Sequence, residues 1–159
     1  MMRKECNIMK IVFAASSGGH LEQLLMLKPL MEKYDSILVT EKTDYSPGKF
    51  NIKTYYMKQI NRKEILFVPK LIINTWRSIL LIIKERPNVM ITTGVLAVIP
   101  LALFIKLFGG ELIYIESFAK VCSKNLTGNF LYKFADQFYV QWEEMLKLYP
   151  NAIYKGGIY

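Results

Sequence analysis

The sequence predicts an α/β fold in which a Rossmann-like parallel sheet forms one domain over residues 1–159. Short apolar runs, typical of buried strands, alternate along the chain with longer segments of helical apolar spacing. This alternation indicates a parallel sheet with helices on its faces. A chain of 159 residues, 52% hydrophobic and 21% charged, suits one globular core and excludes disorder, collagen and coiled coil.

Three strands and two helices are predicted in the first half of the chain. The first apolar run ends at Ser16-Ser17-Gly18-Gly19, which indicates a strand followed by a tight loop. Residues 41–50 contain Asp, Ser, Pro and Gly and are expected to form a loop. Pro69 suits the first turn of the long second helix, and Pro87 ends that helix. The predicted strands are 10–15, 36–40 and 53–57, and the predicted helices are 20–33 and 65–86.

The second half repeats the alternation of strand and helix. Thr93-Gly94 closes its first strand, and Gly109-Gly110 precedes its second. The predicted strands are 89–92, 112–115 and 138–140, and the predicted helices are 95–108, 130–134 and 143–148.

Positive charge is concentrated between residues 49 and 86. This segment carries nine Lys and Arg against two Glu, whereas the whole chain has a net charge of +8. Positive charge beside the apolar helix predicted at 65–86 indicates an anionic partner, such as a lipid surface or a phosphate group. Nucleic acid is disfavoured, because the charge lies beside an apolar helix and not on a polar, aromatic-studded face. The basic residues are Lys49, Lys53, Lys58, Arg62, Lys63, Lys70, Arg77, Lys84 and Arg86.

Whether a helix crosses or lies on a membrane is a separate question. Lys70 and Arg77 interrupt the helix predicted at 65–86, and a spanning helix needs about 20 mostly apolar residues. We therefore favour a helix lying in the interface, with Lys63, Lys70, Asn74, Arg77 and Lys84 on one polar stripe facing the headgroups. An ordinary surface helix packed on the sheet is an equally good interpretation.

The cysteines and the first residues bear on cellular location. Cys6 and Cys122 are too few for a disulfide framework, and the spacing of Cys and His suggests no metal site. The first ten residues contain no secretory signal pattern. We expect a reducing, cytosolic location, with no metal and no bound cofactor.

Three strand ends carry residues suited to phosphate and proton chemistry. Ser17, Gly18 and Gly19 allow close backbone approach to an anion, and His20 can act as a base. The loop lacks the GxGxxG pattern, and no acidic residue is expected at the end of the second strand, so dinucleotide binding is not predicted. Gly94 follows the fourth strand, and Glu116 and Ser117 follow the fifth. In open parallel sheets such strand ends form a ligand crevice, although a turn or cap explains each motif alone.

Four segments carry a resemblance to a known family: SSGGHLEQLL, PNVMITTGVLAVIP, ELIYIESFAKV and LTGNFLYKFADQFYVQWEEMLKLYPNAIYKGG. They resemble the acceptor-side subunit of the two-part N-acetylglucosaminyltransferase of dolichol-linked oligosaccharide synthesis. They are still more similar to the bacterial capsular and exopolysaccharide "enhancer" subunits of two-part β-1,4-glycosyltransferases. The resemblance implies the N-terminal, acceptor-binding half of a GT-B glycosyltransferase, and the length of 159 residues suits one such half.

The resemblance also implies a reaction and its partners. A separate donor-binding subunit would hold a UDP-sugar, and a polyprenyl-pyrophosphate-linked sugar would be the acceptor of an inverting transfer. The subunit would lie peripherally on the cytoplasmic face of an anionic cell membrane and be active only with its partner. We expect His20 or Glu116 to act as the base, or only to position the pyrophosphate. Acceptor phosphates are expected at Ser17, Gly18, Gly19, Gly94 and Ser117, and lipid or acceptor phosphates at Arg77. The alternative is a non-catalytic membrane recruiter or chaperone of the donor-binding subunit.

Overall fold

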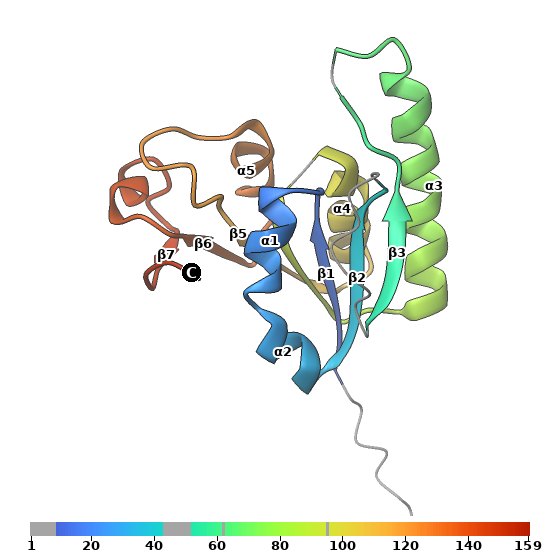
Figure 1. Ribbon diagram of the computed structural model, residues 1–159, viewed down its shortest axis with the longest axis horizontal. Helices are drawn as coiled ribbons and strands as arrows, with labels where there is room; N and C mark the ends of the chain where they lie inside the picture. The colour runs from blue at the N-terminus through green and yellow to red at the C-terminus, as the bar shows by residue number, and fades with distance from the viewer. Residues whose placement is uncertain (1–8, 43–51, 62, 95) are drawn as a thin grey trace, which may run out of the picture.

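The computed structural model describes residues 9–42, 52–61, 63–94 and 96–159 (Figure 1). Cys6, Lys49, Arg62, Val95 and most of the loop expected at 41–50 lie outside the described residues. Seven parallel strands form one sheet in the order β3-β2-β1-β4-β5-β6-β7. This order confirms the predicted Rossmann-like α/β fold. The strands are β1 Lys10–Ala15, β2 Asp35–Glu41, β3 Lys53–Met57, β4 Val89–Gly94, β5 Glu111–Ile115, β6 Gln137–Val140 and β7 Ile153–Tyr154.

Helices connect these strands. The α-helices are α1 Gly19–Leu25, α2 Lys28–Lys33, α3 Phe67–Glu85, α4 Ile99–Leu107 and α5 Leu126–Leu131, and two short 3₁₀ helices are η1 Leu96–Val98 and η2 Glu143–Lys147. Among the described residues, no helix is both long and apolar enough to cross a membrane.

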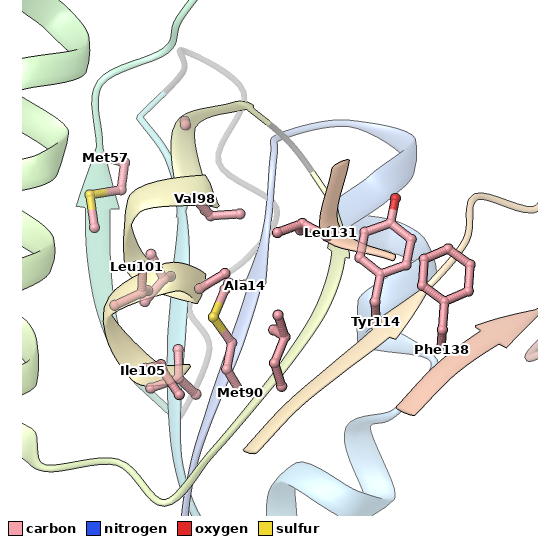
Figure 2. Packing of buried hydrophobic residues seen from close by; sticks show 14 of the residues in the cluster. Ala14, Met57, Met90, Val98, Leu101, Ile105, Tyr114, Leu131 and Phe138 are labelled. Atoms are coloured by element: carbon pink, nitrogen blue, oxygen red, sulfur yellow. The ribbon is translucent and has the colours of Figure 1, made fainter. Parts of the chain in front are cut away.

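Two hydrophobic clusters cover the two faces of the sheet. The first lies between the sheet and helices α3 and α4, and Figure 2 shows its Leu101 and Ile105 on the sheet-facing side of α4, near Met90. The second packs Leu21, Leu24 and other residues of α1 and α2 against the opposite face. Because both faces are covered, the central strands β1 and β4 are buried almost throughout, including Thr92 and Thr93 of β4.

The helix predicted over 20–33 is wrong as a single element. It divides at Met26 and Leu27 into α1 and α2. Pro29 lacks a backbone N–H and would collide with the carbonyl four residues earlier, so it can stand only in the first turn of a new helix.

Several other elements in the second half differ from the prediction. The helix expected at 130–134 is α5, which begins at Leu126 because Asn125 caps it by accepting a hydrogen bond from the Gly128 N–H. The segment at 143–148 is a 3₁₀ turn, and the two-residue strand β7 was not predicted. The helix expected from residue 95 to 108 consists of η1 followed by α4.

Candidate functional site

The carboxyl ends of β1, β4 and β5 meet at one edge of the sheet, because these strands are neighbours and parallel. A pocket of about 530 Å³ opens there. It brings together three of the predicted residues, His20, Gly94 and Ser117. The full lining is His20, Thr93, Gly94, Leu96, Tyr114, Ser117, Ala119, Lys120, Lys124, Asn125, Leu126 and Thr127.

The glycine loop connects β1 to α1, and His20 is the second residue of α1. Gly18 has φ +77°, a left-handed conformation that favours glycine, and its carbonyl accepts the first backbone hydrogen bonds of α1. A Cβ on Gly19 would meet no atom within 4 Å. Ser17, Gly18 and Gly19 are not among the lining residues of the pocket, so this loop positions His20 and does not form the pocket wall.

His20 presents a half-buried imidazole to the pocket. Its backbone carbonyl accepts a hydrogen bond of 3.0 Å from the Thr93 hydroxyl, which ties the start of α1 to the end of β4. The buried Nδ1 atom has no hydrogen-bond partner among the described residues. Burial lowers the pKa of His20 below 6.5, and this outweighs the raising effect of the Thr93 backbone. The ring is therefore neutral near pH 7 and can accept a proton.

Glu116 is fully buried, with 0% exposure, behind the pocket wall. Its Oε1 accepts hydrogen bonds from the Ser117 N–H (2.8 Å), the Tyr114 hydroxyl (3.4 Å) and the Asn125 amide. Its Oε2 accepts one from the Tyr149 hydroxyl (3.2 Å). Burial raises the pKa of Glu116, and these donors oppose the rise only in part. The carboxylate thus joins β5 to α5 and to the segment after η2.

Glu41 is a buried acid that the sequence analysis missed. Strand β2 runs one residue further than predicted and ends on Glu41, so the expectation of no acidic residue there is wrong. Burial raises the pKa of Glu41 above 4.5, and the nearby backbone of Ile60 and Ser17 opposes the rise only in part. Glu41 therefore lies buried at the end of β2, close to the backbone of the glycine loop and of the segment that leads into α3.

Lys120 and Lys124 are pocket residues that the sequence analysis also missed. The sequence signal that could have indicated them is their position, three and seven residues after Ser117. Only the tertiary structure shows that this loop folds back over the strand ends and brings both lysines to the pocket. Within the part of the chain that the structure describes, no group of three or more His, Cys, Asp or Glu side chains could hold a metal ion.

The structure does not bring Arg77 to this pocket. Its guanidinium donates to the Tyr56 carbonyl at 3.0 Å and lines a separate groove of about 530 Å³ between β3 and α3. That groove also contains Tyr55 and Lys84, whose Nζ lies 5.9 Å from the centre of the Tyr55 ring.

Helix α3 turns several polar residues inward and apolar residues outward. Asn74, predicted on a headgroup-facing stripe, is buried, and its amide exchanges two hydrogen bonds with the Lys58 backbone. Glu85 is buried as well, whereas Trp76 is 62% exposed. The predicted polar stripe facing the headgroups is therefore wrong at two of its residues. Asn74 points into the protein, and Lys63 lies before the first residue of α3. The exposed apolar residues of this region are Ile65, Leu66, Val68, Ile72, Trp76, Leu80 and Ile83, here called the outer face of α3.

Comparisons with known proteins give a consistent assignment. The family described as "Oligosaccharide biosynthesis protein Alg14 like" matches residues 11–158. The chain is 30% identical to the UDP-N-acetylglucosamine transferase subunit ALG14 of Yarrowia lipolytica, over 92% of this chain and 80% of that protein. It is 25% identical to the human subunit of the same name, over 94% of this chain and 83% of that protein.

A solved structure shows the same fold. The MurG structure from Acinetobacter baumannii superimposes with a TM-score of 0.69 at 16% identity, covering 86% of this chain. The chain spans only 42% of the MurG chain, so the likeness concerns one part of that protein.

Proposed function

Because the chain belongs to the family of Alg14-like oligosaccharide biosynthesis proteins, we propose that it is the acceptor-binding, membrane-associated subunit of a heteromeric glycosyltransferase. A separate chain would hold the UDP-sugar, and this chain would hold a polyprenyl-pyrophosphate-linked sugar. The setting we propose is bacterial capsule or exopolysaccharide synthesis, on the cytoplasmic face of the membrane. The observation that carries the proposal is one pocket lined both by His20, whose pKa burial lowers, and by two lysines.

The proposed reaction is an inverting transfer without metal. His20 takes the proton from the acceptor hydroxyl, whose oxygen attacks the anomeric carbon of the UDP-sugar. As the new C–O bond forms, the bond to UDP breaks, and UDP leaves with its electron pair. Burial keeps the His20 ring unprotonated, which suits this role. Glu116 remains the second candidate base, but its carboxylate is fully buried and accepts four hydrogen bonds.

The outer face of α3 supports membrane association. A monomeric soluble protein rarely leaves a long apolar helix face uncovered, and this one includes Trp76, suited to a membrane interface. Arg77 and Lys84 line the groove beside this face together with Leu80 and Ile83, so positive charge lies next to the apolar surface that would meet an anionic membrane. Phe108, after α4, lines one groove with Ile83 and extends the apolar surface.

A reconstituted transfer assay tests the catalytic proposal. This chain and the donor-binding chain would be purified together and supplied with a panel of UDP-sugars and a short-chain polyprenyl-pyrophosphate-sugar. We expect transfer with one donor, reduced on the order of a hundredfold in His20→Ala, as is typical when a general base is lost. Lys28→Ala, in the exposed part of α2, is the matched control. Undiminished transfer by His20→Ala would remove His20 from the reaction.

The second candidate function is a non-catalytic membrane recruiter, which the outer face of α3 favours. Replacing Ile72, Trp76 and Ile83 by glutamine should release the chain from vesicles containing anionic lipid, whereas Met26→Gln, exposed between α1 and α2, should not. Recruitment alone predicts that the α3 variant abolishes transfer on membranes while His20→Ala does not. The acceptor-binding proposal predicts that His20→Ala also loses transfer to a detergent-soluble acceptor.

A further inference from the structure

The pocket wall formed by residues 117–127 carries two cations and no anion. Lys120 and Lys124 line the same pocket as His20, and no Asp or Glu is among its lining residues. The Ser117 and Thr127 hydroxyls can donate hydrogen bonds, whereas the Thr93 hydroxyl and the Asn125 amide already donate, to the His20 carbonyl and to Glu116 and Tyr114. The pocket therefore combines donors with positive charge, which is the chemistry that recognises an anionic oxygen ligand.

The wall is held in place by buried contacts. The Lys120 N–H donates to the Ser117 carbonyl at 2.9 Å, which closes a turn immediately after β5. Gln23 fixes the same turn from α1, donating to the Glu116 carbonyl at 3.2 Å and accepting from the Phe118 N–H at 3.3 Å. Asn125 links the far end of the wall to the Glu116 carboxylate and caps α5. The loop that carries the lysines is thus preorganised by several elements.

The two ammonium groups remain available. Among the described residues, neither lysine takes part in a salt bridge. The nearby Glu116 carboxylate already accepts hydrogen bonds from Ser117, Tyr114, Asn125 and Tyr149. Lys124 lies over the Tyr149 ring, 4.8 Å from its centre, a contact that orients the ammonium without neutralising it.

We propose that Lys120 and Lys124 bind a diphosphate group in this pocket. Compact ammonium groups bind phosphate oxygens as point charges, and two of them suit a ligand that carries several negative charges. A pocket of about 530 Å³ lies within the usual size range of small-molecule sites and leaves room beside a diphosphate. The assignment rests on the proposed transferase function for its biological ligand, which is the diphosphate of either the prenyl-linked acceptor or the nucleotide sugar.

Direct titration with inorganic pyrophosphate tests the assignment without requiring transfer. Lys120→Gln and Lys124→Gln should each weaken binding to the full chain about tenfold, which corresponds to ~1.4 kcal/mol, and the double variant should weaken it more. Lys133→Gln and Lys147→Gln are matched controls, because both lysines are exposed in the same part of the chain and do not line the pocket. Calorimetry gives the affinities, and unfolding midpoints show that all variants fold.

The controls decide whether the pocket or the overall charge binds the anion. Unchanged controls with a weakened double variant support the assignment. A double variant that binds pyrophosphate as tightly as the parent overturns it. So does an equal loss in the control pair, because the attraction would then belong to the net charge of the surface.

Two further titrations identify the source of the diphosphate. Farnesyl diphosphate represents the acceptor, and UDP represents the donor. Loss of farnesyl diphosphate binding in the double variant assigns the lysines to the acceptor, and loss of UDP binding assigns them to the donor. If the double variant retains both, the assignment fails. Because these measurements use the isolated chain, their failure leaves the transferase proposal to be judged by the His20 assay.

Discussion

Replacing Glu85 by glutamine should loosen the attachment of α3 to the sheet. The Glu85 side chain is 4% exposed and accepts from Lys10 Nζ at 3.2 Å, Lys53 Nζ at 2.6 Å and the Tyr55 hydroxyl at 2.5 Å. Burial alone would raise its pKa, but the hydrogen bonds from Lys53, Tyr55 and Lys10 outweigh burial and lower the pKa to about 2. The folded protein therefore favours the charged carboxylate.

The magnitude follows from this pKa. A change from 4.5 to about 2 corresponds to at most ~3.4 kcal/mol of unfolding free energy. The Lys53 side chain is 54% exposed, so solvent screening reduces the contribution to about 1–2 kcal/mol. For a domain of this size, that loss lowers the midpoint of thermal unfolding by about 2–8 °C.

The pH dependence separates this ion cluster from a general packing defect. Because the folded pKa of Glu85 is lowered, its stabilisation is present above about pH 4.5 and is lost as the pH falls toward 2. Denaturant unfolding of the parent and Glu85→Gln should thus differ at pH 7 and converge on acidification. Glu32→Gln, whose pair with Lys28 is about two thirds exposed, should change little at either pH. Equal stability of parent and Glu85→Gln at pH 7, or a gap that persists at pH 2, would refute the reasoning.

Three further substitutions test the site. In the assembled transferase, the acid limb of the kcat profile should lie below pH 6.5, because burial lowers the pKa of His20, and it should disappear in His20→Ala. Burial raises the pKa of Glu116, so the parent protein should lose stability as the pH rises above 4.5. Glu116→Gln has no carboxyl group to ionise there and should not show this loss. The difference in unfolding free energy between the parent and Glu116→Gln should therefore change as the pH rises above 4.5. In Gly128→Ala, the new Cβ would press against the Glu116 carboxylate and lie 3.0 Å from the Tyr114 hydroxyl, which should cost about 1–3 kcal/mol in denaturant unfolding. Gly19→Ala, with no atom within 4 Å of its Cβ, is the control for that cost.

Local patterns in the sequence were sufficient to find most of the sheet. Strands β1 and β3 have the predicted bounds, and the long helix at 65–86 is α3 with its ends drawn in by one or two residues. These elements depend on side-chain spacing and on prolines, which act within a few residues. Neighbouring parallel strands end at one edge, so the approach of His20 to Gly94 and Ser117 also followed from the pattern.

Contacts between distant segments decided the remainder. The two-residue strand β7 exists only by pairing with β6, and Asn125, which caps α5, is also tied to Glu116 after β5. Lys120 and Lys124 join the pocket because the loop after β5 folds back over the strand ends.

The orientation of α3 shows most clearly which features the sequence determines and which the tertiary structure decides. The sequence determines that the helix is amphipathic and basic, but a periodic pattern does not specify which face meets the protein. The tertiary structure turns Asn74 toward the Lys58 backbone and Glu85 toward Lys10 and Lys53, and it leaves Trp76 exposed. A buried polar group must find a partner, and those partners lie on other segments of the chain, so only the folded chain decides which face of the helix is covered.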